Sequence, residues 1–254
     1  MSASDKNRRR EFLAASATVA TVATGLAGVG LVALAPGVQL IQPAAAHDHG
    51  ASSKVRWGLL VDTTRCASGC KACVSACNAE NAIEPGSGRP AQNSQWIRKI
   101  ELVEQSSGRA VSLPMMCQHC EQPPCVDVCP TGASFRRADG IVLVDRHICI
   151  GCRYCMMACP YKARSFVHEP LTRQNPEVPR GKGCVEACTF CVQRIDAGKQ
   201  PACVEACKQA GHDAMLFGDL KDPASEIAKR IASTATSQVR ADLRLGTGVR
   251  YQGI

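Results

Sequence analysis

Seventeen cysteines are the residues of this 254-residue chain whose spacing points most directly to chemistry. The run from Cys149 to Pro160 has the pattern C-x2-C-x2-C-x3-C-P, in which three closely spaced thiolates can surround one [4Fe–4S] cubane. The fourth cysteine of such a run, here Cys159, usually binds a neighbouring cluster. The run from Cys117 to Pro130 also ends in a Cys-Pro pair. Two such runs predict two cubanes that share one fold.

Two further groups of cysteines flank these runs. The first group spans Cys66–Cys77 with spacings x3, x2 and x3, so its first gap is one residue wider, and Gly69 can relax that loop. The last group consists of Cys188, Cys191, Cys203 and Cys207. Sixteen of the 17 cysteines then supply four cubanes. Cys184 is left over as a spare buried thiol, although its x3, x2 spacing would also let it replace Cys188 as a ligand.

Disulfide bonds and structural zinc fit these cysteines less well than clusters do. The number of cysteines is odd, and cysteines two or three residues apart make poor disulfide bridges. Structural zinc prefers separated C-x2-C pairs over triplets that are followed by Cys-Pro. A disulfide-rich exported binding protein is therefore the weaker alternative.

Residues 1–46 have the pattern of a targeting segment. Arg9-Arg10-Glu11-Phe12-Leu13 matches the R-R-x-F-L motif of a twin-arginine signal, and Ala44-Ala45-Ala46 offers a cleavage site. This route carries folded cargo, as a protein whose clusters are assembled in the cytoplasm requires. We therefore expect a periplasmic protein, bound to the membrane through its partners. The alternative is that the weakly apolar stretch 14–34 is kept as a membrane anchor.

The formal net charge of +8 does not predict a nucleic-acid surface. Residues 1–46 account for +2 of it, and four cubanes would bring the remaining +6 to roughly −2, because bound clusters carry charge of their own. No basic stretch has interleaved aromatic residues. The sequence also lacks a phosphate-binding glycine loop and a convincing nucleophile–base pair. We expect neither nucleic acid nor a small-molecule substrate.

The stretches between the cysteine groups predict short elements of secondary structure. These are a strand at 55–62, a hairpin within 96–113, a turn at 138–140 before a strand at 141–145, a surface loop at 168–183 and a helix at 225–239.

The order of the four groups resembles that of the four-cluster ferredoxin-like electron-transfer subunits of respiratory redox systems. The resemblance is carried by Cys117-Gln-His-Cys-Glu-Gln-Pro-Pro-Cys125, Cys149-Ile-Gly-Cys-Arg-Tyr-Cys155, Cys159-Pro-Tyr161 and Phe217-Gly-Asp219, and it covers about residues 55–254. Within this family the chain is most similar to the exported iron–sulfur subunit of the DsrMKJOP complex of sulfur metabolism. The resemblance implies a subunit that carries single electrons through four [4Fe–4S] clusters and is not itself an enzyme.

The resemblance also implies an α+β fold. Two ferredoxin-like modules would be related by pseudo-twofold symmetry, with the inner module inserted in the outer one and extra hairpins and loops. The corresponding division is a signal peptide (1–46), the first half of the outer module (55–112), the inner module (113–168), the second half of the outer module (169–215) and a C-terminal extension (216–254).

The family pattern further implies which cysteines share a cluster. The expected sets are Cys66, Cys70, Cys73 and Cys207; Cys77, Cys188, Cys191 and Cys203; Cys117, Cys120, Cys125 and Cys159; and Cys129, Cys149, Cys152 and Cys155. Cys77 and Cys207 lack the proline that follows Cys129 and Cys159, so the outer module departs from the usual pattern.

The implied partners are an NrfD-like integral membrane subunit (DsrP-like), a multihaem cytochrome c (DsrJ-like), and DsrM-like and DsrK-like subunits. The alternative within the family is the electron-transfer (beta) subunit of a molybdopterin oxidoreductase, such as a polysulfide, tetrathionate or dimethyl sulfoxide reductase. A twin-arginine signal on this chain argues mildly against that alternative, because many such subunits lack a signal and are exported with a catalytic partner.

Several residues near the cysteines have more than one interpretation. We expect His119 to be a solvent-facing loop histidine, with hydrogen bonding to a cluster as the alternative. Met156 and Met157 are expected to pack around a cluster. Arg153, Lys162 and Arg194 are either solvated charges or cations that raise cluster potentials.

Overall fold

The computed structural model describes residues 32–35, 38–40, 51–86 and 88–254. The chain divides into two units, Met1–His47 and Asp48–Ile254. In the first unit, β1 (Val32–Ala35) pairs antiparallel with β2 (Val38–Leu40). The rest of the segment 1–46 lies outside the described residues. The twin-arginine signal and its cleavage site therefore remain predictions.

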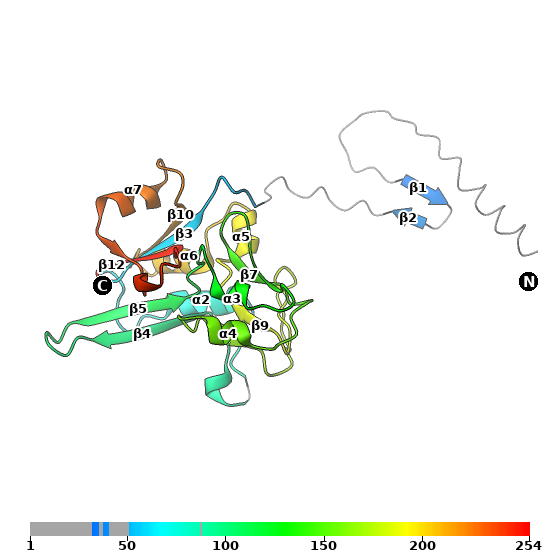
Figure 1. The fold of residues 1–254 in the computed structure, drawn as a ribbon, viewed down its shortest axis with the longest axis horizontal. Coiled ribbons are helices and arrows are strands. Elements are labelled where there is room, and N and C mark those ends of the chain that lie inside the picture. The colour runs from blue at the N-terminus through cyan, green and yellow to red at the C-terminus, as the bar shows by residue number, and fades with distance from the viewer. Residues whose placement is uncertain (1–31, 36–37, 41–50, 87) are drawn as a thin grey trace, which may run out of the picture. The chain divides into compact units, whose positions relative to one another are not determined.

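A four-stranded sheet organises the second unit, in the order β10-β3-β12-β11. The strands are β3 (Trp57–Asp62), β10 (Met215–Asp219), β11 (Thr236–Ser237) and β12 (Val249–Gln252). The chain segment of β3 is buried from Gly58 to Asp62, and this strand pairs antiparallel with β10 and parallel with β12. The predicted strand at 55–62 is confirmed, and it leads directly into the first cysteine group. Most residues of the other three strands belong to the segment predicted as a C-terminal extension (Figure 1).

Three antiparallel strand pairs lie between the cysteine groups along the chain. They are β4–β5 (Ile97–Val103 with Ala110–Met116), β6–β7 (Ser134–Arg136 with Val142–Val144) and β8–β9 (Arg164–Phe166 with Val185–Ala187). Strand β5 ends immediately before Cys117, and β9 ends immediately before Cys188. The long β4–β5 hairpin extends away from the body of this unit (Figure 1). The hairpin within 96–113 and the strand at 141–145 are therefore confirmed.

The helices are short. They are α2 (Ala72–Glu80), α3 (Pro124–Asp127), α4 (Tyr154–Ala158), α5 (Val192–Asp196), α6 (Ala202–Gln209) and α7 (Glu226–Ser233), with 3-10 turns at Pro90–Gln92 and Ala241–Leu243. The backbone N–H of Ala228 donates to the Ser225 hydroxyl, which caps α7 at its start. The prediction of one helix over 225–239 was wrong at its C-terminal end. Thr234 is extended and Thr236 enters β11, because this stretch pairs with β12.

The segment 168–183 contains neither helix nor strand, as predicted. It is nevertheless anchored in the interior by Arg180, whose guanidinium donates to both carboxylate oxygens of Glu186 on β9, at 2.7 and 2.9 Å. Both side chains are buried. The loop is therefore held by an internal ion pair.

Among the described residues, no helix is long and apolar enough to cross a membrane. The mixture of short helices and strands agrees with the expected α+β class. The pseudo-twofold relation of the modules and the insertion of one in the other remain predictions.

Candidate metal centres

Two packed helices carry four of the predicted ligands. Helix α2 contains Cys73 and Cys77, α6 contains Cys203 and Cys207, and all four side chains are buried. Residues four apart lie on the same face of a helix. The thiol of Cys73 interacts with that of Cys207, and Cys77 interacts with Cys203. Each helix therefore gives one thiol to each of two groups.

The first group consists of Cys66, Cys70, Cys73 and Cys207. Burial raises the pKa of Cys73 to about 11, and the neighbouring thiols of Cys66 and Cys207 contribute to this rise. Burial, with Cys66 and Cys70, also raises the pKa of Cys207, although a hydrogen bond from the backbone N–H of Ala214 opposes this. That N–H lies 3.3 Å from the Cys207 sulfur. The structure thus brings the first predicted set together.

Strand β4 fixes the widened loop of this group. The Lys99 ammonium donates to the carbonyl oxygens of Ala67 and Cys70, the latter at 2.6 Å. The Glu101 carboxylate accepts from the Gly69 N–H at 3.3 Å and from the Ser68 hydroxyl at 3.2 Å. Both charged side chains therefore hold the loop. The extra residue is accommodated without loss of the group.

The second group consists of Cys77, Cys188, Cys191 and Cys203. Burial raises the pKa of Cys188 well above its ordinary value, and the neighbouring thiols of Cys77, Cys203 and Cys191 add to the shift. The side-chain amide of Asn81 donates from Nδ2 to the Cys77 sulfur, 3.7 Å away. The second predicted set is therefore also brought together, with Cys188 in it.

Cys184 lies elsewhere. Its thiol donates to the carbonyl oxygen of Arg146 at 3.3 Å, and it interacts with Cys149 of the inner cysteine runs. Its side chain is buried. This position supports Cys188 as the ligand and Cys184 as a spare thiol.

The third group consists of Cys117, Cys120, Cys125 and Cys159, held by the loop after β5 and by the packed helices α3 and α4. Burial raises the pKa of Cys117 to about 12; Arg164 opposes the shift, and Cys125 and Cys159 add to it. Burial and the same two thiols raise the pKa of Cys120 to about 12. The third predicted set is therefore assembled in the interior.

A buried arginine lies against this group. Arg164, at the start of β8, donates from Nη2 to the Cys125 sulfur at 3.1 Å and from Nη1 to the Ser134 hydroxyl at 2.7 Å. Burial opposes its charge, but Cys125, Cys117 and Cys155 raise the pKa of Arg164 overall. Because Cys155 belongs to the fourth predicted set, Arg164 lies between two sets. Sequence reasoning missed this residue.

The fourth predicted set is the most exposed. Cys152 is exposed, Cys129 and Cys149 are partly buried, and Cys155 is buried and interacts with Cys125. Burial favours a higher pKa for Cys129, but hydrogen bonds from Ser134 and Thr131 outweigh it and lower the pKa. The common cluster of these four cysteines remains a prediction.

Exposed apolar side chains occur in the sequence around the ligands of the fourth set. Ile150, Tyr154 and Met157 are 67, 58 and 74% exposed. The expectation that Met157 packs around a cluster was therefore wrong, because it lies on the outer side of the short helix α4, whereas Met156 packs against the core. An exposed cysteine and an apolar surface thus occur together.

The expectation of a solvent-facing His119 was wrong. Its side chain has 0% exposure, because the loop that carries it is covered by β7 and by the loop of the second group. The backbone N–H of Val142 donates to His119 Nδ1 at 3.0 Å, and the imidazole stacks on Phe190. Arg194 is likewise not a simply solvated charge, since it pairs with Glu80 of α2 and Glu205 of α6.

The donors around the sulfurs fit iron–sulfur clusters. A buried guanidinium, a side-chain amide and backbone N–H groups point at the thiol sulfurs of Cys125, Cys77, Cys129 and Cys207. All 17 cysteines are free of disulfides. Within the described ranges, no three His, Cys, Asp or Glu residues converge closely enough to hold one metal ion.

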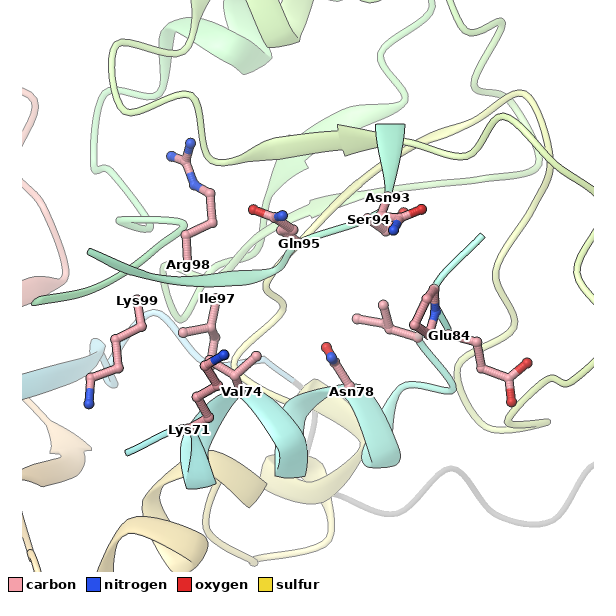
Figure 2. A pocket seen from close by; sticks show the side chains of 12 residues that line it. Lys71, Val74, Asn78, Glu84, Asn93, Ser94, Gln95, Ile97, Arg98 and Lys99 are labelled. Carbon is pink, nitrogen blue, oxygen red and sulfur yellow. The ribbon is translucent and has the colours of Figure 1, made fainter. Parts of the chain in front are cut away.

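A pocket between α2 and β4 lies outside the cysteine groups. Figure 2 shows Lys71, Asn78, Glu84 and Lys99 around it. Neither histidine nor cysteine lines this pocket, and Lys99 is already engaged by the first cysteine loop. The thiol chemistry of the chain therefore lies elsewhere.

Comparison with known proteins identifies the cofactor. Two family models, each described as a 4Fe-4S dicluster domain, match residues 65–133 and 109–220. All 16 predicted ligands lie within these two matches. The chain therefore binds [4Fe–4S] clusters, and two dicluster domains correspond to four.

Three curated relatives match most of this chain. The chain is 40% identical to "Hdr-like menaquinol oxidoreductase iron-sulfur subunit 1" of Archaeoglobus fulgidus, over 96% of this chain and 97% of that protein. It is 41% identical to a tetrathionate reductase subunit of Salmonella typhimurium, over 80% of this chain and 72% of that protein. It is 42% identical to "Protein NrfC" of Escherichia coli, over 76% of this chain and 78% of that protein.

Proposed function

This chain belongs to the family of iron–sulfur electron-transfer subunits of redox complexes that contain 4Fe-4S dicluster domains, and from this premise we propose that it conducts single electrons through four clusters in series. The observation that carries the proposal is the order of the cysteine groups. Cys73 and Cys203 connect the first group to the second, and Cys125 and Cys155 connect the third to the fourth. His119 and Phe190 connect the second to the third. Catalysis then belongs to partner subunits.

The finer assignment is the role of DsrO in the DsrMKJOP complex of sulfur metabolism. The chain would exchange electrons with an NrfD-like, quinone-interacting membrane subunit (DsrP-like) and with a multihaem cytochrome c (DsrJ-like), in a complex completed by DsrM-like and DsrK-like subunits. The twin-arginine pattern in 1–46 supports export of a folded periplasmic subunit. The near full-length match to a menaquinol oxidoreductase subunit supports the quinone connection.

The exposed end at the fourth group is the proposed contact with the membrane subunit. Ile150, Tyr154 and Met157 are exposed and lie within five residues of the exposed Cys152 in the sequence, and an apolar surface suits burial against a protein partner. Met157→Glu should reduce co-purification with the membrane subunit and leave the iron content unchanged. Leu102→Glu, at an exposed apolar site on β4, is the matched control.

The alternative function is electron transfer for a molybdopterin oxidoreductase. It is favoured by the similarity to the tetrathionate reductase subunit and to a "Putative dimethyl sulfoxide reductase iron-sulfur subunit" of Halobacterium salinarum, 40% identical over 72% of this chain. The two functions differ in the cofactor of the partner. Purification of the native complex distinguishes them: c-type haem without molybdenum supports the first, whereas stoichiometric molybdenum supports the second.

Iron analysis tests the cluster proposal itself. Four cubanes predict about 16 iron and 16 sulfide per chain, and fewer than about four iron would refute it. Replacement of Arg9 and Arg10 by lysine tests the export proposal. We expect the holoprotein to stay in the cytoplasmic fraction; unchanged periplasmic recovery would contradict twin-arginine export.

A further inference from the structure

The four cysteine loops share a backbone feature. In each loop, the residue directly before the second cysteine has a positive φ: +74° at Gly69, +43° at His119, +68° at Gly151 and +55° at Phe190. Glycine adopts this conformation without strain, whereas other residues adopt it at a cost. The loops of the first and fourth groups use glycine. Those of the second and third groups accept the strain of a ring-bearing residue.

The two strained residues contact each other. The rings of His119 and Phe190 stack with centroids 3.7 Å apart and an interplanar angle of 27°, and both side chains are almost completely buried. Phe190 also meets Phe217 edge to face at 5.4 Å. Backbone strain in folded proteins persists where the surroundings support it and often marks a functional position. Here it marks the junction between the second and third groups.

The hydrogen bonds of His119 define its tautomer. Because the backbone N–H of Val142 donates to Nδ1, the proton of the neutral imidazole is on Nε2. A ring whose Nδ1 accepts a hydrogen bond carries no proton there, so the imidazole is neutral. Among the described residues, nothing accepts a hydrogen bond from the buried Nε2. An unsatisfied buried donor is rare and needs an acceptor.

We propose that His119 is a positioning residue for electron transfer between the two middle clusters. Its Nε2–H donates to the cluster of Cys117 and Cys120, and its ring, stacked on Phe190, is the contact with the cluster of Cys188 and Cys191. The inference rests on the proposed series of four clusters. One electron leaves one middle cluster and enters the other, and the imidazole proton stays on Nε2 throughout.

The hydrogen bond sets the direction of the expected effect. Donation to cluster sulfur stabilises the reduced, more negative state and therefore raises the reduction potential. Loss of one such bond should change the reduction equilibrium of that cluster about tenfold, which is about 59 mV for one electron. The other three clusters should change little.

The test is an EPR-monitored redox titration of the full-length holoprotein. His119→Phe keeps a ring for the stack and removes both nitrogens, so we expect one cluster to fall in potential by about 59 mV. His147→Phe is the matched control, because His147 is exposed close to Cys149, and it should shift no potential. Unchanged potentials in His119→Phe at full iron content would overturn the proposal.

Two further measurements keep the proposal testable if His119→Phe loses iron. His119→Asn suits a positive φ and retains an N–H donor, so it should preserve more of the potential than the phenylalanine variant. In wild-type protein labelled with ¹⁵N-histidine, pulsed EPR should detect a nitrogen coupled to a reduced cluster, and the signal should vanish in His119→Asn. Absence of that coupling in the wild type would refute the hydrogen bond. The iron count that supports the four-cluster function would be unaffected.

Discussion

Replacement of Arg164 by methionine should lower the reduction potentials of the two clusters on either side of it. The guanidinium lies 3.1 Å from the Cys125 sulfur and also interacts with Cys155. We take the added electron to reside on the cluster, at roughly 6 Å from the charge. At an effective dielectric constant of about 20, a unit charge at that distance contributes about 3 kcal/mol, or about 120 mV for one electron. Relaxation of the site reduces this, and we expect a fall of roughly 60–120 mV.

The assay is a redox titration of purified full-length protein, followed by EPR, with iron content measured on each sample. Lys162→Met is the matched control, because Lys162 is an exposed cation two residues away in the sequence and solvent screens its charge. Arg164→Lys keeps the charge and loses the planar fork, so it should recover most of the potential but not all of it. The methionine variant also leaves Ser134 and Cys125 without a donor, at a cost of about 1–3 kcal/mol.

Three results would contradict this reasoning. Equal potentials in wild type and Arg164→Met at full iron content would mean that the charge does not act on the clusters. A rise in potential would contradict the sign of the electrostatic argument. A fall of equal size in Lys162→Met would assign the effect to net charge and not to the buried position.

Three other perturbations have defined outcomes. Lys99→Met removes the donor that holds the loop of the first group, so about four of 16 iron atoms should be lost more rapidly to a chelator, whereas Lys71→Met next to α2 should behave as wild type. Glu186→Gln leaves the buried Arg180 without its charged partner and should lower the free energy of unfolding by about 3–5 kcal/mol in denaturant titrations of the holoprotein; a loss below about 1 kcal/mol would contradict this. Complete removal of iron should unfold the second unit, as followed by circular dichroism, because ligand thiols come from distant chain segments; retained tertiary structure without iron would refute this coupling.

The sequence predicted the cysteine groups well because their chemistry is local. Three thiolates within a few residues can surround a cluster only in a narrow set of loops, so spacing alone locates each loop. The first three predicted sets are brought together in the structure, and the fourth is the most exposed. The strand before Cys66 and the hairpin before Cys117 were also visible, since alternation and turn residues act over short distances.

Side-chain direction within the loops was not predictable. The burial of His119 depends on Val142 and on Phe190, which lies in a distant loop, and no periodicity reports such contacts. Arg164 was missed for a similar reason: β8 has three residues, too few for alternation to reveal which side faces the clusters. The predicted helix at 225–239 ran too far because pairing of β11 with β12 overrode local preference.

The arrangement of glycines and rings in the four loops has a physical explanation. If the positive φ served loop closure alone, glycine would suit all four positions. Glycine at His119 and Phe190 would relieve about 1–3 kcal/mol of backbone strain at each position. Removal of the Phe190 ring alone would cost about 3–5 kcal/mol in lost burial and cavity formation. The rings are therefore retained because the gain from packing exceeds the strain, and they occur at the two loops that meet. Glycine occurs at the equivalent positions of the first and fourth groups, and at Gly151 a side chain would collide with the backbone carbonyl of Gly183.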